Sequence, residues 1–174
     1  MNDINVNPAV NDGGSDDIDI NDLMRVRRQK LKELRAAGKD PFTVTKYDIT
    51  FTSEDIAAKF DEIAEPEHDP DTGLPLSDKA PVEVSLAGRI MLKRIMGKAS
   101  FAHVQDKCGM FQIYVKKDDV GAEEYSAFKT LDIGDIIGIK GTVFRTKTGE
   151  ISLRASEFVL LSKSLHPLPE KFHG

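Results

Sequence analysis

The sequence has few of the residues that build metal or disulfide sites, and it lacks the long apolar runs that cross membranes. Its single cysteine, Cys108, excludes an internal disulfide and any zinc site made of several cysteines. The histidines are His68, His103, His166 and His173. They do not have the spacing of metal ligands, so we predict no metal site. With no bilayer-spanning run and no basic-then-apolar leader, we expect a soluble cytoplasmic protein that has no membrane partner.

Positive charge is scarce only in one part of the chain. The formal net charge is −5, but residues 1–22 carry six acidic side chains and no basic ones. Between Val84 and Ser164 there are 13 lysines and arginines against nine acidic residues. The local charge of this region is therefore positive and compatible with a nucleic-acid partner, which the overall charge alone argues against.

The first 38 residues predict a tail followed by a basic helix. Residues 1–18 are expected to be disordered, because they are rich in Asn, Asp and Gly. Residues 21–37 have helical periodicity, with Asn21 as the N-cap and Gly38 just beyond the end. The apolar stripe of this helix is Leu23, Val26, Leu31 and Leu34. Its cations are Arg25, Arg27, Arg28, Lys30, Lys32 and Arg35. These cations either meet RNA phosphates or form the solvated face of a helix that docks by its leucines.

A helical extension over residues 19–81 is expected to continue from this helix. Pro41 ends the first unit, and residues 39–52 should be extended. Ser53 can cap a second helix, whose inward residues are Ile56, Phe60 and Ile63. Residues 65–81 are acidic and contain four prolines, which is typical of a surface loop.

Strand-like alternation dominates the region after Pro81. The inner residues of the first strand, 82–96, are Val82, Val84, Leu86, Gly88, Ile90 and Leu92. Those of the next two strands are Ala102, Val104, Phe111, Ile113 and Val115. A helix over 120–131 follows, anchored by Tyr125, Phe128 and Leu131. The inner residues of strands 135–144 and 150–161 are Ile137, Ile139, Gly141, Val143, Ile151, Leu153 and Ala155.

The order β-β-β-α-β-β, with a long first strand that Gly88 and Gly97 allow to bend, is that of an OB-fold barrel. We therefore predict a mainly β fold: a five-stranded OB-fold barrel over 82–164, with a short helix between strands 3 and 4. The N-terminal helical extension precedes this barrel, and a proline-containing linker over 165–174 follows it.

The outward phase of the strands holds an aromatic ring among polar side chains. Phe101 and His103 fall on the outer side of the second strand, and Gln112 and Tyr114 fall on that of the third. The outward residues of the fifth strand are Glu150, Ser152 and Arg154. Near Phe101 in the sequence are Arg89, Lys93, Arg94 and Lys98. An exposed ring in basic surroundings is typical of a base-stacking platform. The alternative is that Phe101 caps a core or packs under a loop.

Four stretches of the chain carry a family resemblance. They are RRQKLKELRAAGKDPF (27–42), AGRIMLKRIMGKASFAHVQD (87–106), GDIIGIKGTVFRTKTGEISL (134–153) and SLHPLPEKFHG (164–174). Together they resemble the N-terminal anticodon-binding region of bacterial-type class II lysyl-tRNA synthetases. The barrel pattern is shared with aspartyl and asparaginyl enzymes, whereas the RIMGK run, the KTGE turn and the linker resemble the lysyl type.

The resemblance implies anticodon-binding roles for four residues. Phe101 would stack on the central base, a uridine for lysine, and Arg94 would hold a base edge or a phosphate. Gln112 would donate to a uracil carbonyl, and Glu150 would accept from N3–H, which cytosine lacks. From the residues alone, Gln112 fits a solvated strand position equally well, and Glu150 fits a surface pair with Arg154. Further possible RNA contacts are Arg89, Lys93, Lys98, His103, Arg145, Lys147 and Arg154.

The resemblance also implies a larger enzyme. Family members bind ATP, lysine and Mg²⁺ in a catalytic domain after the linker and form homodimers through that domain. We expect none of that domain among these residues, and hence no catalytic residue and no cofactor site. The chain would recognise the anticodon loop of lysine tRNA as part of a lysine–tRNA ligase. Alternatives are the anticodon domain of an aspartyl or asparaginyl-tRNA synthetase, a non-specific single-strand binder, or a protein-interaction module that docks through the first helix.

Overall fold

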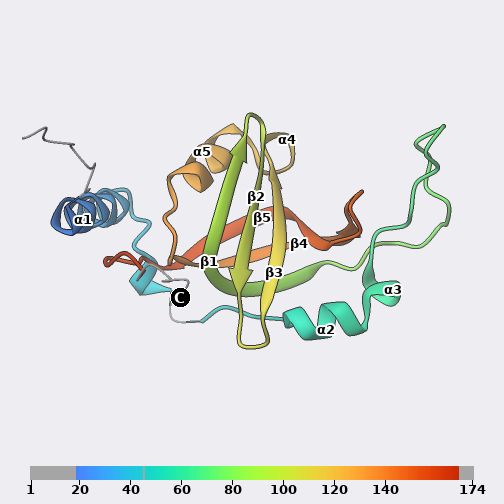
Figure 1. Cartoon of the computed structure of the whole chain (residues 1–174), viewed down its shortest axis with the longest axis horizontal. Coiled ribbons are helices and arrows are strands. Elements are labelled where there is room, and N and C mark those ends of the chain that lie inside the picture. The colour runs from blue at the N-terminus through green and yellow to red at the C-terminus, as the bar shows by residue number, and fades with distance from the viewer. Residues whose placement is uncertain (1–18, 45, 169–174) are drawn as a thin grey trace, which may run out of the picture.

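Five strands form the centre of the molecule in a computed structural model that describes residues 19–44 and 46–168 (Figure 1). The strands are β1 (Val84–Met96), β2 (Ala99–Gln105), β3 (Met110–Lys116), β4 (Ile136–Arg145) and β5 (Ile151–Ser162). They close a barrel in the order β1-β2-β3-β5-β4, in which β3 and β5 are parallel. The predicted OB-fold arrangement is confirmed. The disorder predicted for residues 1–18 and the linker end, 169–174, lie outside the described residues.

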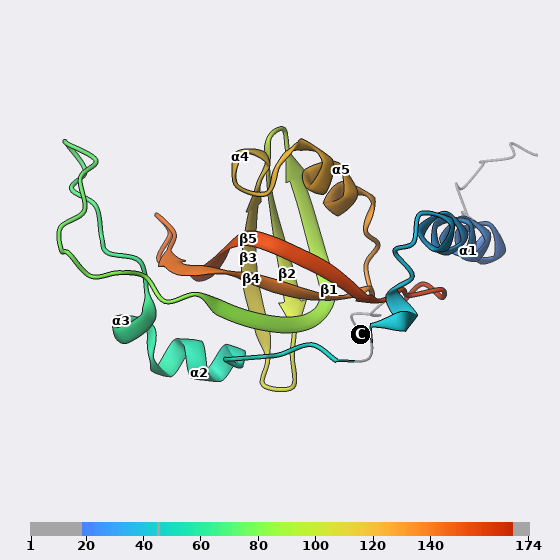
Figure 2. The ribbon, with the colours of Figure 1, turned by 180° about the vertical axis from the view of Figure 1, so that it is seen from behind.

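Strand β1 belongs to both sides of the barrel because it changes partner near its middle. Its first half pairs with β4 and its second half pairs with β2, and Arg89 takes part in both pairings. The bend depends on Gly88, where a Cβ would lie 2.9 Å from the carbonyl oxygen of Gln105. As a result, β2 and β3 cross β4 and β5 at a wide angle when seen from either side (Figures 1 and 2).

The inner residues of all five strands form one core, as the alternation predicts. Fully buried examples are Val84, Ile90, Val104, Ile113, Ile137, Ile139 and Leu153. Helix α5 (Ala122–Thr130) adds its two buried rings, and the helices α2 (Ser53–Ala58) and α3 (Phe60–Ile63) add buried isoleucines. Helices α5 and α2 lie at opposite ends of the barrel (Figures 1 and 2). Each buried aliphatic side chain contributes about 1.5–3 kcal/mol to the free energy of folding.

A bulge in β1 reverses its side-chain alternation after Ile90. The register with β2 shifts between Ile90 and Leu92, so Met91 is an extra residue and the side chains beyond it change sides. Leu92 is consequently 51% exposed, and its predicted inward position is wrong. Val82, which was also expected to face inward, precedes the strand and is exposed.

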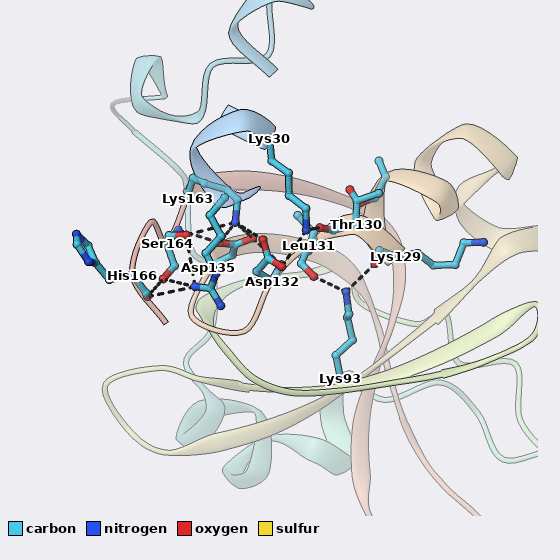
Figure 3. A network of polar contacts seen from close by, with 12 residues as sticks. Lys30, Lys93, Lys129, Thr130, Leu131, Asp132, Asp135, Lys163, Ser164 and His166 are labelled. Carbon is cyan, nitrogen blue, oxygen red and sulfur yellow. Dashed lines mark hydrogen bonds and ion pairs between the residues drawn. The ribbon is translucent and has the colours of Figure 1, made fainter. Parts of the chain in front are cut away.

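Lys93, just beyond this bulge, caps the end of α5. Its ammonium donates to the carbonyl oxygen of Lys129 at 2.8 Å and also to that of Leu131 (Figure 3). These carbonyls lie at a helix C-terminus, where they lack helical partners and attract a cation. Burial lowers the pKa of Lys93, although nearby Asp132 favours its charged form. The one-turn helix α4 (Lys117–Val120), which sequence periodicity did not predict, precedes α5.

The two helices predicted ahead of the barrel are present, but they begin at neighbouring residues. Helix α1 (Ile20–Ala36) is capped by Asp19, whose carboxylate accepts from the amide of Asn21 at 2.9 Å. Helix α2 begins at Ser53, and Thr52 caps it through a capping box. Asn21 and Ser53 are therefore helical residues, and their predicted roles as caps are wrong.

The segments between these helices and the barrel contain little regular structure. A 3₁₀ turn, η1 (Pro41–Thr43), interrupts the expected extended connection, and residues 65–81 form a loop closed by a bridge between His68 and Pro75. Within residues 19–44 and 46–168, no helix is long and apolar enough to cross a membrane. In the same part of the chain, no three potential metal ligands gather.

Two cations hold α1 against the rest of the molecule. The Lys30 ammonium lies 2.9 Å from the carboxylate of Asp132, and Arg27 donates to the hydroxyl oxygen of Ser164 at 3.0 Å. Of the predicted apolar stripe, Leu31 is buried but Val26 is 50% exposed. The helix is therefore docked by part of its basic face, a possibility that neither interpretation of the sequence contained.

A buried group of charges lies where α1, the end of β5 and the α5–β4 connection meet (Figure 3). We call it the Lys163 cluster, and it consists of Lys30, Asp132, Asp135, Lys163 and Ser164. Lys163 is 5% exposed, and its ammonium lies 2.7 Å from Asp132 and 2.8 Å from the fully buried Asp135. Asp135 also accepts from the amide of Ser164 at 2.8 Å. Burial opposes ionisation of Asp132, but hydrogen bonds from Lys163 and Lys30 outweigh it and lower its pKa.

Candidate nucleic-acid interface

The outer surfaces of β1, β2, β3 and β5 arrange the predicted site residues in two cross-strand rows. The Phe101 row consists of Arg94, Phe101, Tyr114 and Arg154. The Gln112 row consists of Leu92, His103, Gln112 and Ser152. Adjacent strands are about 4.8 Å apart, so neighbouring side chains within a row can touch. The structure thereby brings Phe101 and Gln112, which were predicted from their outward phase, together with Arg94, which was predicted from the family resemblance.

Aromatic rings form the middle of the Phe101 row. The ring centroids of Phe101 and Tyr114 are 4.8 Å apart with the planes tilted by 31°, and Tyr114 lies 6.0 Å from Phe144 on β4. Phe101 is half-buried and lies outside the barrel core, which disfavours a core-capping role. The three rings make a surface on which a base can stack.

Gln112 has one end of its amide occupied and the other free. Its Oε1 accepts from the hydroxyl of Ser152 at 2.9 Å. Among the described residues, its Nε2 makes no hydrogen bond. The side chain is half-buried, so the unused N–H groups can reach a ligand on the outer surface.

Glu150 lies beside the Gln112 row, in the turn before β5. Its side chain is 50% exposed, and its Oε1 lies 3.4 Å from Nε2 of His103, the cross-strand neighbour of Gln112. It does not pair with Arg154, as one interpretation of the sequence held. Arg154 binds Asp119 through two hydrogen bonds of 2.8 and 3.0 Å, and this interaction raises the pKa of Arg154.

The remaining predicted RNA contacts divide into free and engaged cations. Three of these cations have exposed side chains that make no ion pair, hydrogen bond or ring contact with a described residue, and they are Arg94, Lys98 and Lys147. The last two lie in the turns at the ends of β1 and β4.

The engaged or distant cations are Lys93, Arg145, Arg154 and Arg89. Lys93 and Arg154 bind α5 and Asp119 as described above. Arg145 lies 4.7 Å above the ring of Phe60 and donates to the carbonyl oxygen of Gly149. Arg89 pairs with Gln105, four residues along β2 from Phe101, which is about 13 Å at the usual rise of a strand. The structure therefore does not bring Arg89 to the rings.

A family comparison agrees with this geometry. A model of the OB-fold nucleic acid binding domain matches residues 84–161, which include nearly all of the five strands and the helices between β3 and β4. Residues 84–161 are therefore similar to that family. We refer to them as the OB domain.

Known relatives of the chain are bacterial lysine–tRNA ligases. The chain is 49% identical over 156 residues to the ligase of Listeria monocytogenes, a match that covers 90% of the chain and 29% of the relative. The corresponding values for Halalkalibacterium halodurans are 47% over 160 residues, covering 92% and 30%. Those for Staphylococcus aureus are 48% over 156 residues, covering 90% and 30%. The chain thus spans less than a third of the length of these relatives. These matches do not favour the aspartyl or asparaginyl alternative.

Three residues of the OB domain that we did not predict as site residues complete its outer face. Tyr114 and Ser152 were assigned outward phases, but their contacts with Phe101 and Gln112 depend on cross-strand register. Leu92 reaches the Gln112 row only through the bulge. The alternation signal could have flagged Tyr114, because a second outward aromatic on the next strand is itself unusual.

Proposed function

We propose that the OB domain binds the anticodon loop of a lysine tRNA on the Phe101 and Gln112 rows. The observation that carries this proposal is that a ring platform, a free amide donor and a half-exposed carboxylate lie together on one outer face. Phe101 stacks on the central uridine, Gln112 donates to a uracil carbonyl, and Glu150 accepts from N3–H. Arg94, the neighbour of Phe101 on β1, holds a base edge or a phosphate.

In this proposal, stacking on Phe101 supplies affinity, and the hydrogen bonds of Gln112 and Glu150 supply selectivity. Stacking contributes about 1–3 kcal/mol per base and is available to any base. Hydrogen bonds choose between bases, because uracil presents two carbonyl acceptors and an N3–H donor. Cytosine presents an acceptor at N3 and an amine at C4, so it opposes both Glu150 and the amide N–H of Gln112. The arrangement therefore favours uracil at the stacked position.

Binding of two RNA stem-loops that differ in one base tests the proposal. Fluorescence anisotropy should show tighter binding to a loop with the anticodon UUU than to the same loop with UCU. Equal binding of the two loops would contradict recognition of the central uridine. Indifference to loop sequence combined with a preference for long single strands would instead favour a non-specific single-strand binder.

The variant Glu150→Gln probes the acceptor. A glutamine at this position has an amide that can donate to N3 of cytosine as well as accept from uracil, so the UUU preference should shrink. The matched control is Glu157→Gln, which changes an exposed glutamate of β5 that pairs with Lys140. An undiminished preference in Glu150→Gln would remove Glu150 from the proposed role.

We also propose that the chain acts as part of a lysine–tRNA ligase that joins lysine to tRNA in the cytoplasm with ATP and Mg²⁺. Support comes from the 47–49% identity to such ligases. In this proposal, nucleotide chemistry and homodimer formation belong to a catalytic domain in the part of these ligases that the match does not cover. Lysine-dependent ATP–pyrophosphate exchange should be absent from residues 1–174 alone.

A further inference from the structure

Ser152 is a polar residue of the outer face that is fully buried. Its strand neighbours are Gln112 on β3 and Phe144 on β4. Its hydroxyl donates to Oε1 of Gln112 at 2.9 Å, and it makes no other side-chain hydrogen bond within residues 19–44 and 46–168. The hydroxyl is therefore committed to one end of one amide.

This contact determines which end of the Gln112 amide faces a ligand. Oε1 can only accept, so it satisfies the hydroxyl proton of Ser152. If the amide turned over, Nε2 would occupy the place of Oε1 and the hydroxyl would have to accept. Its own proton would then lose the acceptor that it has now, and the described residues show no second hydrogen-bond partner of this hydroxyl, so the turned amide is unfavourable. The side chain of Ser152 thus keeps the N–H groups of Gln112 directed away from β5.

We propose that Ser152 is a positioning residue that sets selectivity for uracil over cytosine by holding the amide of Gln112. The inference rests on the proposed anticodon function. An unrestrained glutamine could rotate by half a turn and accept from the C4 amine of cytosine, and it would then bind either pyrimidine. Ser152 opposes this rotation, so Gln112 meets cytosine with a donor facing a donor. Ser152 itself needs no contact with RNA.

The variant Ser152→Ala tests this role in the stem-loop assay. Binding to the UUU loop should change little, because the favoured amide orientation is still accessible. Binding to the UCU loop should strengthen, so that the UUU-to-UCU affinity ratio falls roughly tenfold, the factor that 1.4 kcal/mol produces. Ser152→Cys fills the same site with a weaker donor and should give an intermediate ratio. The control Ser156→Ala removes an exposed hydroxyl of β5 that bonds to the carbonyl of Lys140, and it should leave the ratio unchanged.

Repeating the Ser152→Ala substitution in a Gln112→Ala variant distinguishes positioning of the amide from general structural damage. In Gln112→Ala there is no amide to hold, so adding Ser152→Ala should leave the affinity ratio where it was. A further fall in that background would show that Ser152 acts through the fold, and it would overturn the inference. If the wild-type protein prefers UUU and Ser152→Ala keeps that preference, the inference about Ser152 is overturned but the proposed function is not. A wild-type protein with no preference would overturn the proposed function and, with it, this inference.

Discussion

The outer face of the OB domain and the Lys163 cluster are both polar, but they satisfy their polar groups in opposite ways. In the Lys163 cluster, one ammonium contacts two carboxylates, and Asp135 takes a further bond from the amide of Ser164. On the outer face, Glu150 is half-exposed with one loose contact of 3.4 Å, and Nε2 of Gln112 has no partner among the described residues.

This difference indicates which region is structural and which is available for binding. Buried charges persist only when nearby groups compensate them, so a fully paired cluster serves the fold. Unused donors and acceptors beside a ring on the outer surface lose nothing by being half-solvated, and they can gain partners when a base binds. Variants in the cluster should therefore affect unfolding, whereas variants on the outer face should affect RNA binding.

The largest expected effect is that of Asp135→Ala. The substitution leaves the Lys163 ammonium buried with one carboxylate fewer and frees the amide of Ser164. Removing one partner of a buried pair costs about 3–5 kcal/mol, and the free energy of unfolding in urea should fall by that order. The control Glu157→Ala breaks an exposed pair with Lys140 and should cost far less stability. A stability loss no greater than that of the control would show that the Lys163 cluster is not structural.

The next largest effect is expected for Phe101→Ala. Loss of the stacking ring should weaken binding to UUU and UCU loops alike by about 1–3 kcal/mol, without changing the ratio between them. Phe101→Trp keeps a stacking surface and should retain most of the affinity. The matched control is Phe42→Ala, which removes an exposed ring in η1, away from both rows. Unchanged anisotropy titrations in Phe101→Ala would place the RNA elsewhere on the molecule.

The barrel core could be predicted from sequence because a period of two assigns every residue of a strand to a side. Ala102, Val104 and Ile113 are buried for that reason. The bulge at Met91 could not be predicted, since an apolar residue fits either side of a strand. Leu92 consequently lies opposite to its expected position, and Lys93, predicted as an RNA contact, pairs with Ala102 of the core. Helix ends were displaced by one or two residues because Asp19 and Thr52 are as suitable for capping as the residues chosen.

For the candidate site, sequence supplied residue types and phases but not contacts. The outward positions of Phe101 and Gln112 followed from alternation, whereas the roles of Arg94 and Glu150 came only from the family resemblance. The bond from Ser152 to Gln112 depends on the parallel register of β3 and β5, which exists only once the barrel closes. The Lys163 cluster joins residues about 30 or more positions apart and has no local signal. The RNA-binding roles themselves stay predictions.

The smallest expected effect is that of Lys147→Ala, and it separates free cations from engaged ones. Lys147 is exposed in the turn that leads to Glu150, so its ammonium can approach a phosphate beside the bound base. Removing one phosphate contact should reduce the slope of log affinity against log salt by about one unit or slightly less, with unfolding unchanged. The control Lys140→Ala removes the same charge from a pair with Glu157 on β4 and β5 and should leave the slope as it was. If both variants lowered the slope equally, the cations would act through overall charge, and the turn beside Glu150 would have no specific place in the interface.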